Sequence, residues 1–287
     1  MKEVMKFAIV GDQGLVGSSL SRSLEASALE FRGFNRTNLD FTSISKSQLM
    51  SSLSGFDVVI NAIGHTKVDL AEREPELARF ANAQVPKMLS EACQELGARF
   101  AHISTDYVFE GNGSSPINVS EEPNPVSAYG RSKLEGERNV LSSGADITIF
   151  RSAWLYSSYR PCFPITISNR IRTQGFVQVV DDQVGQPTYA DDLSNQILKF
   201  MILEQRPKIV HAVASGQASW YDFAVQVAKS MGLNHKQVVL PVPSARYETE
   251  AKRPAWSVLD NSSDLVEPIG DWRERWLIAA EEVLGSR

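Results

Sequence analysis

Short apolar runs rich in β-branched residues alternate with longer segments in the first half of the chain, and the longer segments carry apolar residues at helical spacing. The short runs lack polar alternation, which is typical of parallel strands covered by helices on both faces. This order predicts βαβ units and a parallel sheet. The expected strands are 7–10, 29–34, 57–60, 99–104 and 147–150, and the expected helices are 14–26, 76–96 and 127–141.

The regular alternation weakens beyond Arg151, where prolines become frequent. We expect a strand at 176–180, a helix from Asp191, a strand followed by a helix within 205–232, and a closing helix at 272–284. This pattern indicates a smaller, partly interleaved C-terminal domain. The predicted fold is α/β, a doubly wound parallel sheet of the Rossmann type. Residues 1–152, with about 176–204, are assigned to an NAD(P)-binding domain, and 153–175 and 205–287 to a substrate-binding domain.

Composition narrows the range of partners. The chain has 287 residues, a net charge of -5 and no basic run, so nucleic acid is not an expected partner. No apolar stretch approaches the roughly 20 residues that a membrane span requires, so we expect no membrane partner. Cys93 and Cys162 are too few and too far apart to indicate a disulfide framework or a metal site. We therefore expect no metal, and a reducing compartment, the cytoplasm.

A glycine motif, G-x-x-G-x-x-G, follows the first expected strand and opens the first expected helix. Gly11 would permit a tight turn, Gly14 a close approach to a pyrophosphate, and Gly17 close packing of helix on strand. Leu15 and Val16 belong to the same motif. The helix N-terminus would offer N–H groups and a positive dipole to phosphate. The motif predicts a dinucleotide site, and its spacing is typical of short-chain dehydrogenases.

The second expected strand bears on the choice of cofactor. No acid follows it at the position that would bind free ribose hydroxyls, and Arg36 stands there instead. A guanidinium can pair with a 2′-phosphate, which favours NADPH, with NADH as the alternative cofactor if Arg36 is a solvated surface residue. Asp40 is suited to an adenine amino group or is a plain loop residue. Ala62 and Gly64 follow the third strand and leave room for a cofactor backbone.

Tyr129 and Lys133 form Y-x-x-x-K on an expected helix, so their side chains share one face. A neighbouring ammonium should lower the pKa of the tyrosine and suit it to acid–base chemistry. Thr105 ends the fourth expected strand, at the edge where an open α/β sheet binds ligands. The three groups are predicted to meet beside the nicotinamide.

The motifs described above, together with several further stretches, make the chain similar to the dTDP-4-dehydrorhamnose reductase family over nearly its whole length. The family belongs to the extended short-chain dehydrogenases and reduces a nucleotide-linked 4-keto-6-deoxy sugar at C4. The stretches that carry the resemblance are 11–17, 59–62, 65–72, 104–111, 129–137, 151–156, 182–188 and 253–254.

The resemblance implies a role for each matching residue. Tyr129 would donate the proton, Lys133 would position the nicotinamide ribose and tune Tyr129, and Thr105 would hydrogen-bond the reacting oxygen. The implied contacts to the nucleotide sugar are Thr105, Asp106, Trp154, Thr188 and Arg253, and those that line the cofactor are Gly64, His65 and Thr66.

Three rival functions fit the same scaffold: a nucleotide-sugar 4,6-dehydratase or epimerase, a non-catalytic binding subunit, and a reductase of a different nucleotide sugar. A nucleotide-sugar dehydratase would carry an Asp-Glu pair after the threonine, but Tyr107 follows Asp106 here. A non-catalytic subunit similar to the regulatory β subunit of methionine adenosyltransferase is the rival from another class, and a reductase of a different nucleotide sugar is a third reading. Retention of Thr105, Tyr129 and Lys133 favours catalysis. The expected assembly is a monomer or homodimer.

Overall fold

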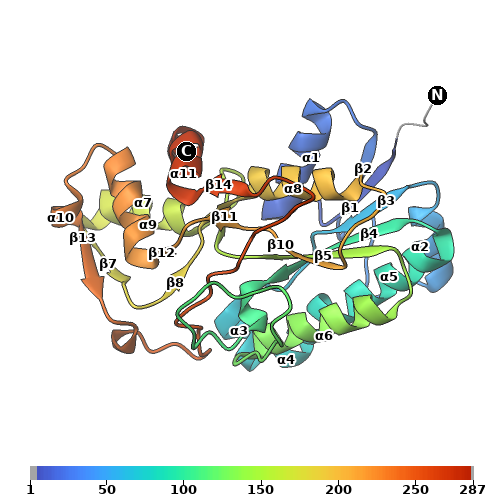
Figure 1. Cartoon of the computed structure of the whole chain (residues 1–287), viewed down its shortest axis with the longest axis horizontal. Coiled ribbons are helices and arrows are strands. Elements are labelled where there is room, and N and C mark those ends of the chain that lie inside the picture. The colour runs from blue at the N-terminus through green and yellow to red at the C-terminus, as the bar shows by residue number, and fades with distance from the viewer. Residues whose placement is uncertain (1–4, 286–287) are drawn as a thin grey trace.

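Residues 5–285 are described by a computed structural model, in which the apolar runs form a six-stranded parallel sheet (Figure 1). The strand order is β10-β5-β4-β3-β1-β2, so the chain fills one side of β1 before it crosses to β3 on the other. Ligand sites of open α/β sheets lie outside the carboxyl ends of the strands at such a crossing. The strands are β1 (Phe7–Val10), β2 (Phe31–Phe34), β3 (Val58–Asn61), β4 (Arg99–Thr105), β5 (Ile147–Ser152) and β10 (Ile209–His211).

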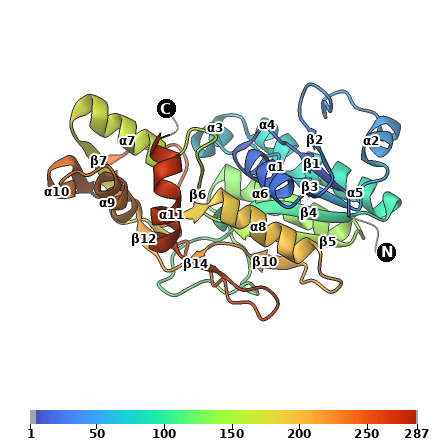
Figure 2. The same cartoon turned by 90° about the horizontal axis from the view of Figure 1, so that it is seen from above.

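Helices cover both faces of this sheet, as Figures 1 and 2 show. Successive residues of a strand point to opposite faces, so Ile9 joins the apolar cluster under α1 and α8, whereas Val10 joins the cluster under α2 and α5. The predicted doubly wound α/β fold is confirmed. The helices are α1 (Leu15–Ala26) and α8 (Ala190–Met201) on one face, and α2 (Lys46–Leu53), α3 (Val68–Arg73), α4 (Pro75–Arg79), α5 (Val85–Leu96) and α6 (Ala128–Ser142) on the other.

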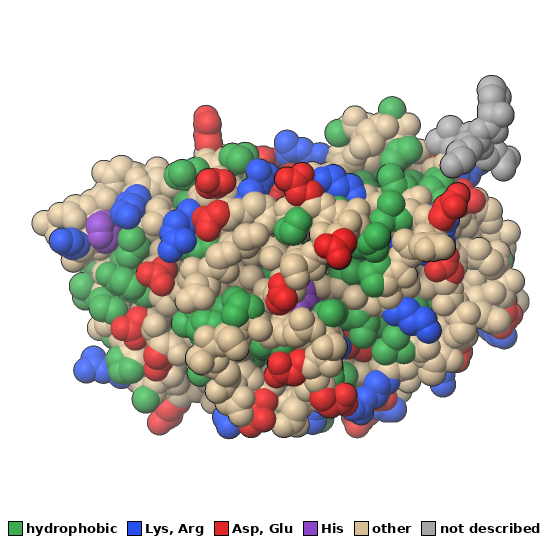
Figure 3. Space-filling view, in the orientation of Figure 1, with side chains coloured by type: hydrophobic (Ala, Val, Ile, Leu, Met, Phe, Trp, Pro, Cys, Tyr) green, Lys and Arg blue, Asp and Glu red, His purple; other side chains and the backbone are tan. Residues whose placement is uncertain are grey.

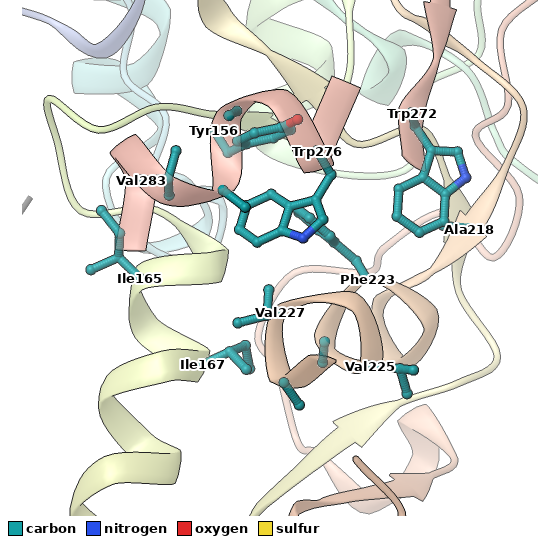
Figure 4. Packing of buried hydrophobic residues seen from close by; sticks show 14 of the residues in the cluster. Tyr156, Ile165, Ile167, Ala218, Phe223, Val225, Val227, Trp272, Trp276 and Val283 are labelled. Atoms are coloured by element: carbon teal, nitrogen blue, oxygen red, sulfur yellow. The ribbon is translucent and has the colours of Figure 1, made fainter. Parts of the chain in front are cut away.

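A smaller lobe lies beyond the carboxyl ends of the strands. Its core is aromatic: Trp272, Trp276, Tyr156 and Phe223 are fully buried, and Figure 4 shows Trp276 and Phe223 between α11 and α9. Both indole N–H groups donate within the lobe, to Gln217 O and Ser230 Oγ. The elements of the lobe are α7 (Phe163–Gln174), β7 (Val177–Val180), α9 (Trp220–Ser230), α10 (His235–Val238), β13 (Val239–Val242) and α11 (Trp272–Gly285).

The remaining elements are short strand pairs and single turns. The pairs are β6 (Leu155–Tyr156) with β9 (Thr188–Tyr189), β12 (Ala218–Ser219) with β8 (Val184–Gly185), and β11 (Ala214–Ser215) with β14 (Ile269–Asp271). The single turns are the π-helical η1 (Phe80–Gln84) and the 3₁₀ turns η2 (Asp106–Val108) and η3 (Ser244–Arg246).

Strand pairing departs from the expected domain boundaries at two places. The expected division assigned about 176–204 to the sheet domain, but β7 pairs with β13 inside the smaller lobe. It also assigned 205–287 to the substrate domain, whereas β10 pairs with β5 as an edge of the main sheet. From the segment 176–204, α8 packs against the sheet and α1. An apolar run identifies a strand but not its partner, because pairing is decided by contacts distant in sequence.

Within residues 5–285, no helix is both long enough and apolar enough to cross a membrane. On the face shown in Figure 3, acidic and basic side chains are interspersed over both lobes.

Candidate active site

The turn between β1 and α1 leaves no room for a side chain at Gly11 or Gly17. Gly11 has a φ of +97°, and a Cβ at Gly17 would lie 2.0 Å from the Gly11 carbonyl oxygen. The Gly11 N–H donates to Phe34 O at 2.7 Å and ties the turn to β2. Gly14 precedes α1 without a side-chain cap, and the first turn of α1 contains no acid. Unpaired N–H groups and the positive end of the helix dipole are therefore available for an anion.

Tyr129, Lys133 and Thr105 are all at least nine-tenths buried. Tyr129 and Lys133 lie one turn apart on α6, and the Lys133 Nζ donates to Ile103 O at 2.6 Å. Thr105 ends β4, and its hydroxyl donates to Asp106 Oδ1 at 2.9 Å. The structure thus places a phenol, an ammonium and a hydroxyl in one small region at the sheet edge.

Local packing holds α6 against this edge. The Ser127 hydroxyl accepts from Gly130 N at 3.1 Å, and Ala128 N donates to Glu72 Oε1 at 2.7 Å, so the first turn is capped from two sides. A Cβ at Gly130 would lie 2.2 Å from Tyr107 O. Glycine at position 130 therefore lets the helix approach the backbone that follows Thr105.

Burial dominates the pKa of each titratable group in this region. It raises the pKa of Tyr129 to about 12, although the Thr105 hydroxyl opposes the shift. It lowers the pKa of Lys133 to about 8 and raises that of Asp106 to about 6. The net lowering of the Tyr129 pKa that was expected from Lys133 is not found, since the cost of burying a phenolate is larger. Tyr129 consequently holds its proton at neutral pH and can donate it.

A cavity of about 500 Å³, which we call the sheet-edge cavity, extends from Gly14 of the glycine turn to Thr105, Asp106 and Tyr129. Its volume is in the range of small-molecule and cofactor sites. The predicted site residues that line it are Gly14, Leu15, Val16, Ala62, Gly64, Thr66, Thr105, Asp106, Tyr129 and Trp154.

A second cavity of about 730 Å³, the lobe cavity, is lined by α7, β7 and the segment 244–254, which we call the strap. Trp220 lines both cavities. Its ring stacks on Trp154 with centroids 3.5 Å apart, and Trp154 has a φ of +46° with its indole against Gly185. Aromatic rings therefore form the wall where the two cavities meet.

The other predicted site residues do not line the sheet-edge cavity; they are Gly11, Gly17, Arg36, Asp40, His65, Lys133, Thr188 and Arg253. Thr188 is fully buried, donates to Gln186 O and accepts from Ala214 N, so its hydroxyl is already paired within the protein. Arg36 and Asp40 are exposed beyond β2. The Asp40 carboxylate accepts from the Thr42 N–H and hydroxyl, which hold its pKa below the usual range. His65 lies beside the lining residues, and neither of its ring nitrogens has a hydrogen-bond partner.

An acid from the glycine turn, Asp12, lies at the end of β2. Asp12 belongs to the glycine turn, and a Cβ at Gly33 would lie 2.2 Å from its Oδ2. Its other carboxylate oxygen accepts from Asn35 Nδ2 at 3.2 Å. The second strand thus lacks an acid of its own, but the glycine at position 33 leaves space for the Asp12 carboxylate.

Asn82 is a residue of the site that the sequence analysis did not identify. It is fully buried in the π-helical η1, where the expected helix 76–96 divides into α4, η1 and α5. Its side chain accepts from His65 N at 2.8 Å and donates to His65 O and to Ser132 Oγ. It therefore fixes the segment after β3 against the helix that carries Tyr129 and Lys133. The one feature of the sequence that could have indicated its role is an asparagine on the apolar face of an expected helix.

Arg253 lines the lobe cavity, but its guanidinium is paired. Both Nη atoms contact the Asp69 carboxylate, at 3.1 and 2.6 Å. This hydrogen bonding, opposed by burial, holds the pKa of Asp69 below its usual value. Arg73 pairs with Glu250 of the same strap. Two arginine–carboxylate pairs therefore fasten the strap to α3.

The parallel sheet, the glycine turn and the Tyr129–Lys133 helix together define a dinucleotide-binding protein of the extended short-chain dehydrogenase/reductase class. Comparison narrows the class to a family. Residues 5–284 match the family model described as RmlD substrate binding domain, and the chain belongs to this family. The resemblance to dTDP-4-dehydrorhamnose reductases is confirmed.

This chain is similar to named relatives over most of their length. The chain is 35% identical to a protein of Mycolicibacterium smegmatis named dTDP-4-dehydrorhamnose reductase, over 98% of this chain and 86% of the relative. It is 32% identical to a Streptomyces antibioticus protein named "Probable dTDP-4,6-dihydroxy-2-methyloxan-3-one 4-ketoreductase", over 98% and 97%.

Solved structures agree with this assignment. A dTDP-4-dehydrorhamnose reductase of Clostridium acetobutylicum superposes with a TM-score of 0.89 at 35% identity, covering 96% of this chain and 99% of that one. The dTDP-4-dehydrorhamnose reductase of Bacillus anthracis, solved in complex with NADP, gives the same TM-score at 30% identity and the same coverage.

Proposed function

We propose that this protein reduces the C4 carbonyl of a nucleotide-linked 4-keto-6-deoxy sugar, converting dTDP-4-dehydro-L-rhamnose to dTDP-L-rhamnose with NADPH, or NADH, as reductant. The observation that carries the proposal is that Thr105 and Tyr129 line a cavity shared with Gly14 of the glycine turn, while Lys133 lies one helical turn from Tyr129 on α6. Family membership and the names of the relatives support it.

The residues of the sheet-edge cavity suit a dinucleotide. The uncapped N-terminus of α1 offers N–H groups to a pyrophosphate, and Ala62 and Gly64 leave space along the lining. Lys133, held by Ile103 O, would hydrogen-bond the nicotinamide ribose. The cofactor would supply a hydride to C4 of the sugar. NADP in the Bacillus anthracis relative supports this assignment.

Tyr129 supplies the proton that completes the reduction. As the C4 carbonyl gains a hydride, its oxygen gains charge and takes the proton from Tyr129 Oη, so the product is an alcohol. Thr105, whose hydroxyl is oriented by Asp106, would hydrogen-bond the same oxygen. The Lys133 ammonium would stabilise the phenolate that remains until a proton returns from solvent.

The rest of the substrate extends toward the smaller lobe. Asp106 and Trp154 would contact the sugar, and the lobe cavity has space for the nucleotide. Arg253 and Thr188 are also proposed to contact the substrate. Both already have partners within the protein, since Arg253 pairs with Asp69 and Thr188 with backbone groups.

A panel of 4-keto nucleotide sugars, followed by the absorbance of reduced nicotinamide with each cofactor, tests the proposal. The fastest turnover is expected with dTDP-4-dehydro-L-rhamnose. A different best substrate would favour the alternative of another nucleotide-sugar reductase, a possibility supported by the name of the Streptomyces relative. Cofactor binding without turnover on any sugar would favour the non-catalytic subunit. We also propose a cytoplasmic monomer or homodimer, which light scattering after size-exclusion chromatography tests.

Cofactor preference should depend on two residues of opposite charge. Arg36→Ala is expected to weaken NADPH by about 1.5–3 kcal/mol and leave NADH almost unchanged, because only NADPH carries a 2′-phosphate. Asp12→Asn should shift preference further toward NADPH, because the Asp12 carboxylate lies at the end of β2. Measuring kcat/KM with both cofactors decides this. Equal effects of Arg36→Ala on the two cofactors would refute the contact.

Arg253→Ala should raise KM for the nucleotide sugar by about 10- to 100-fold with little change in kcat, if the guanidinium also contacts the diphosphate. Arg73→Ala is the matched control, because Arg73 fastens the same strap through Glu250. An equal rise in KM for both variants would mean that Arg253 only tethers the strap.

Turnover should decline as the pH rises through about 8, the pKa to which burial lowers Lys133. Lysine is charged below its pKa, so the ammonium that supports Tyr129 is present at neutral pH and is lost as the pH rises above the pKa of Lys133. A pH profile of kcat/KM from 6 to 10 measures this, and Lys133→Met should give a low profile without that decline. A wild-type profile that stays level to pH 10 would contradict the role of the ammonium.

A further inference from the structure

Among the described residues that line the sheet-edge cavity none is basic, and Lys133, which donates to Ile103 O, is not one of them. Among the cavity's described lining residues the one charged side chain is Asp106, an acid, and the adjoining turn contains a second acid, Asp12. A dinucleotide pyrophosphate would bring two negative charges to this turn. The α1 dipole offsets a part of that charge, roughly half an elementary charge at a helix N-terminus. A cation from another element would complete the site.

Arg160 reaches the glycine turn from the segment that leads into α7. Its Nε donates to Gln13 O at 2.7 Å, and its Nη2 donates to the same oxygen. Pro161 and Cys162, the next residues along the chain, line the sheet-edge cavity beside Gly14. Arg160 therefore contacts the turn that precedes α1, and the two residues after it line the same cavity as Gly14.

Arg160 is exposed, and its guanidinium is hydrogen-bonded to an uncharged group. Other arginines of the two lobes pair with carboxylates: Arg22 with Glu282, and Arg275 with Asp192. Arg160 instead donates to a backbone carbonyl, which carries no net charge. A guanidinium has five N–H donors in a planar fork, so donors remain for phosphate oxygens while one pair contacts the turn.

We propose that Arg160 binds the pyrophosphate of the dinucleotide cofactor and, through Gln13 O, links residues 160–162 to the glycine turn. The inference rests on the proposed cofactor function. The contact is directed at a group that NADPH and NADH share, so Arg160 should strengthen both equally, in contrast to Arg36.

Isothermal titration calorimetry of the whole protein with NADPH, NADH and ADP-ribose tests the proposal without reference to turnover. Arg160→Ala should raise Kd for all three ligands by about 10- to 100-fold, the effect of losing a charge-assisted contact. Arg160→Lys, which keeps the charge but not the fork, should give an intermediate loss. The difference between wild type and Arg160→Ala should narrow at high salt, because the contact is exposed.

Arg172→Ala is the matched control, since it removes an exposed arginine of α7 that contacts Leu284 O. It should bind the three ligands as the wild type does. Wild-type binding with an unchanged Kd for Arg160→Ala would overturn the inference and leave the proposed function intact. A loss confined to NADPH would also overturn it, because the 2′-phosphate would then be the partner. Failure of the wild type to bind either cofactor would instead reject the proposed function.

Discussion

Replacing Tyr129 with Phe should lower kcat by about 100- to 10,000-fold, the usual contribution of a general acid. The phenol lines the sheet-edge cavity, and burial raises its pKa to about 12, so it retains its proton for transfer at neutral pH. Phenylalanine keeps the ring that packs edge-on against Tyr107, with centroids 5.6 Å apart. The loss should therefore appear in kcat, measured with saturating substrate, while cofactor binding by calorimetry stays near that of the wild type.

Tyr156→Phe provides the matched control for this change. Tyr156 is fully buried in the smaller lobe, and its hydroxyl has no hydrogen-bond partner. Removing that hydroxyl should leave kcat unchanged. If Tyr129→Phe turned over as fast as Tyr156→Phe, Tyr129 could not be the proton donor, and a water or another side chain would have to supply the proton.

Local patterns were sufficient to predict the sheet and the centre of the site. Apolar runs ending in Gly11 or Thr105 identify strand ends, and parallel strands bring such ends to one edge. The spacing of Tyr129 and Lys133 depends only on the helical repeat. These features depend on contacts that are near in sequence or that the fold class imposes.

The remaining features depend on contacts between distant segments. The partner of β7 is β13, about sixty residues later, and no local pattern encodes that choice. Arg160 meets Gln13 across 147 residues, and Arg253 meets Asp69 across 184. The sign of the shift in the Tyr129 pKa also depends on burial, which a motif does not report.

Removing Arg151 should lower the free energy of unfolding by about 3–5 kcal/mol, because it would leave a buried carboxylate unpaired. Arg151 on β5 and Glu137 on α6 form two hydrogen bonds, of 3.0 and 2.7 Å, with side chains only 3% and 1% exposed. Urea titration of Arg151→Met against the wild type measures the loss.

The double variant Arg151→Met/Glu137→Leu separates the cost of an unpaired charge from the worth of the pair. Buried ion pairs replaced by apolar residues of similar volume are often neutral or more stable, since neither charge has to be desolvated. The double variant should therefore regain most of the stability that Arg151→Met loses. If it stayed as unstable as the single variant, packing of Arg151 over the Phe109 ring, 5.0 Å away, would be the larger contribution. Because Glu137 lies one turn beyond Lys133 on α6, kcat of the double variant also reports whether the pair positions the catalytic helix.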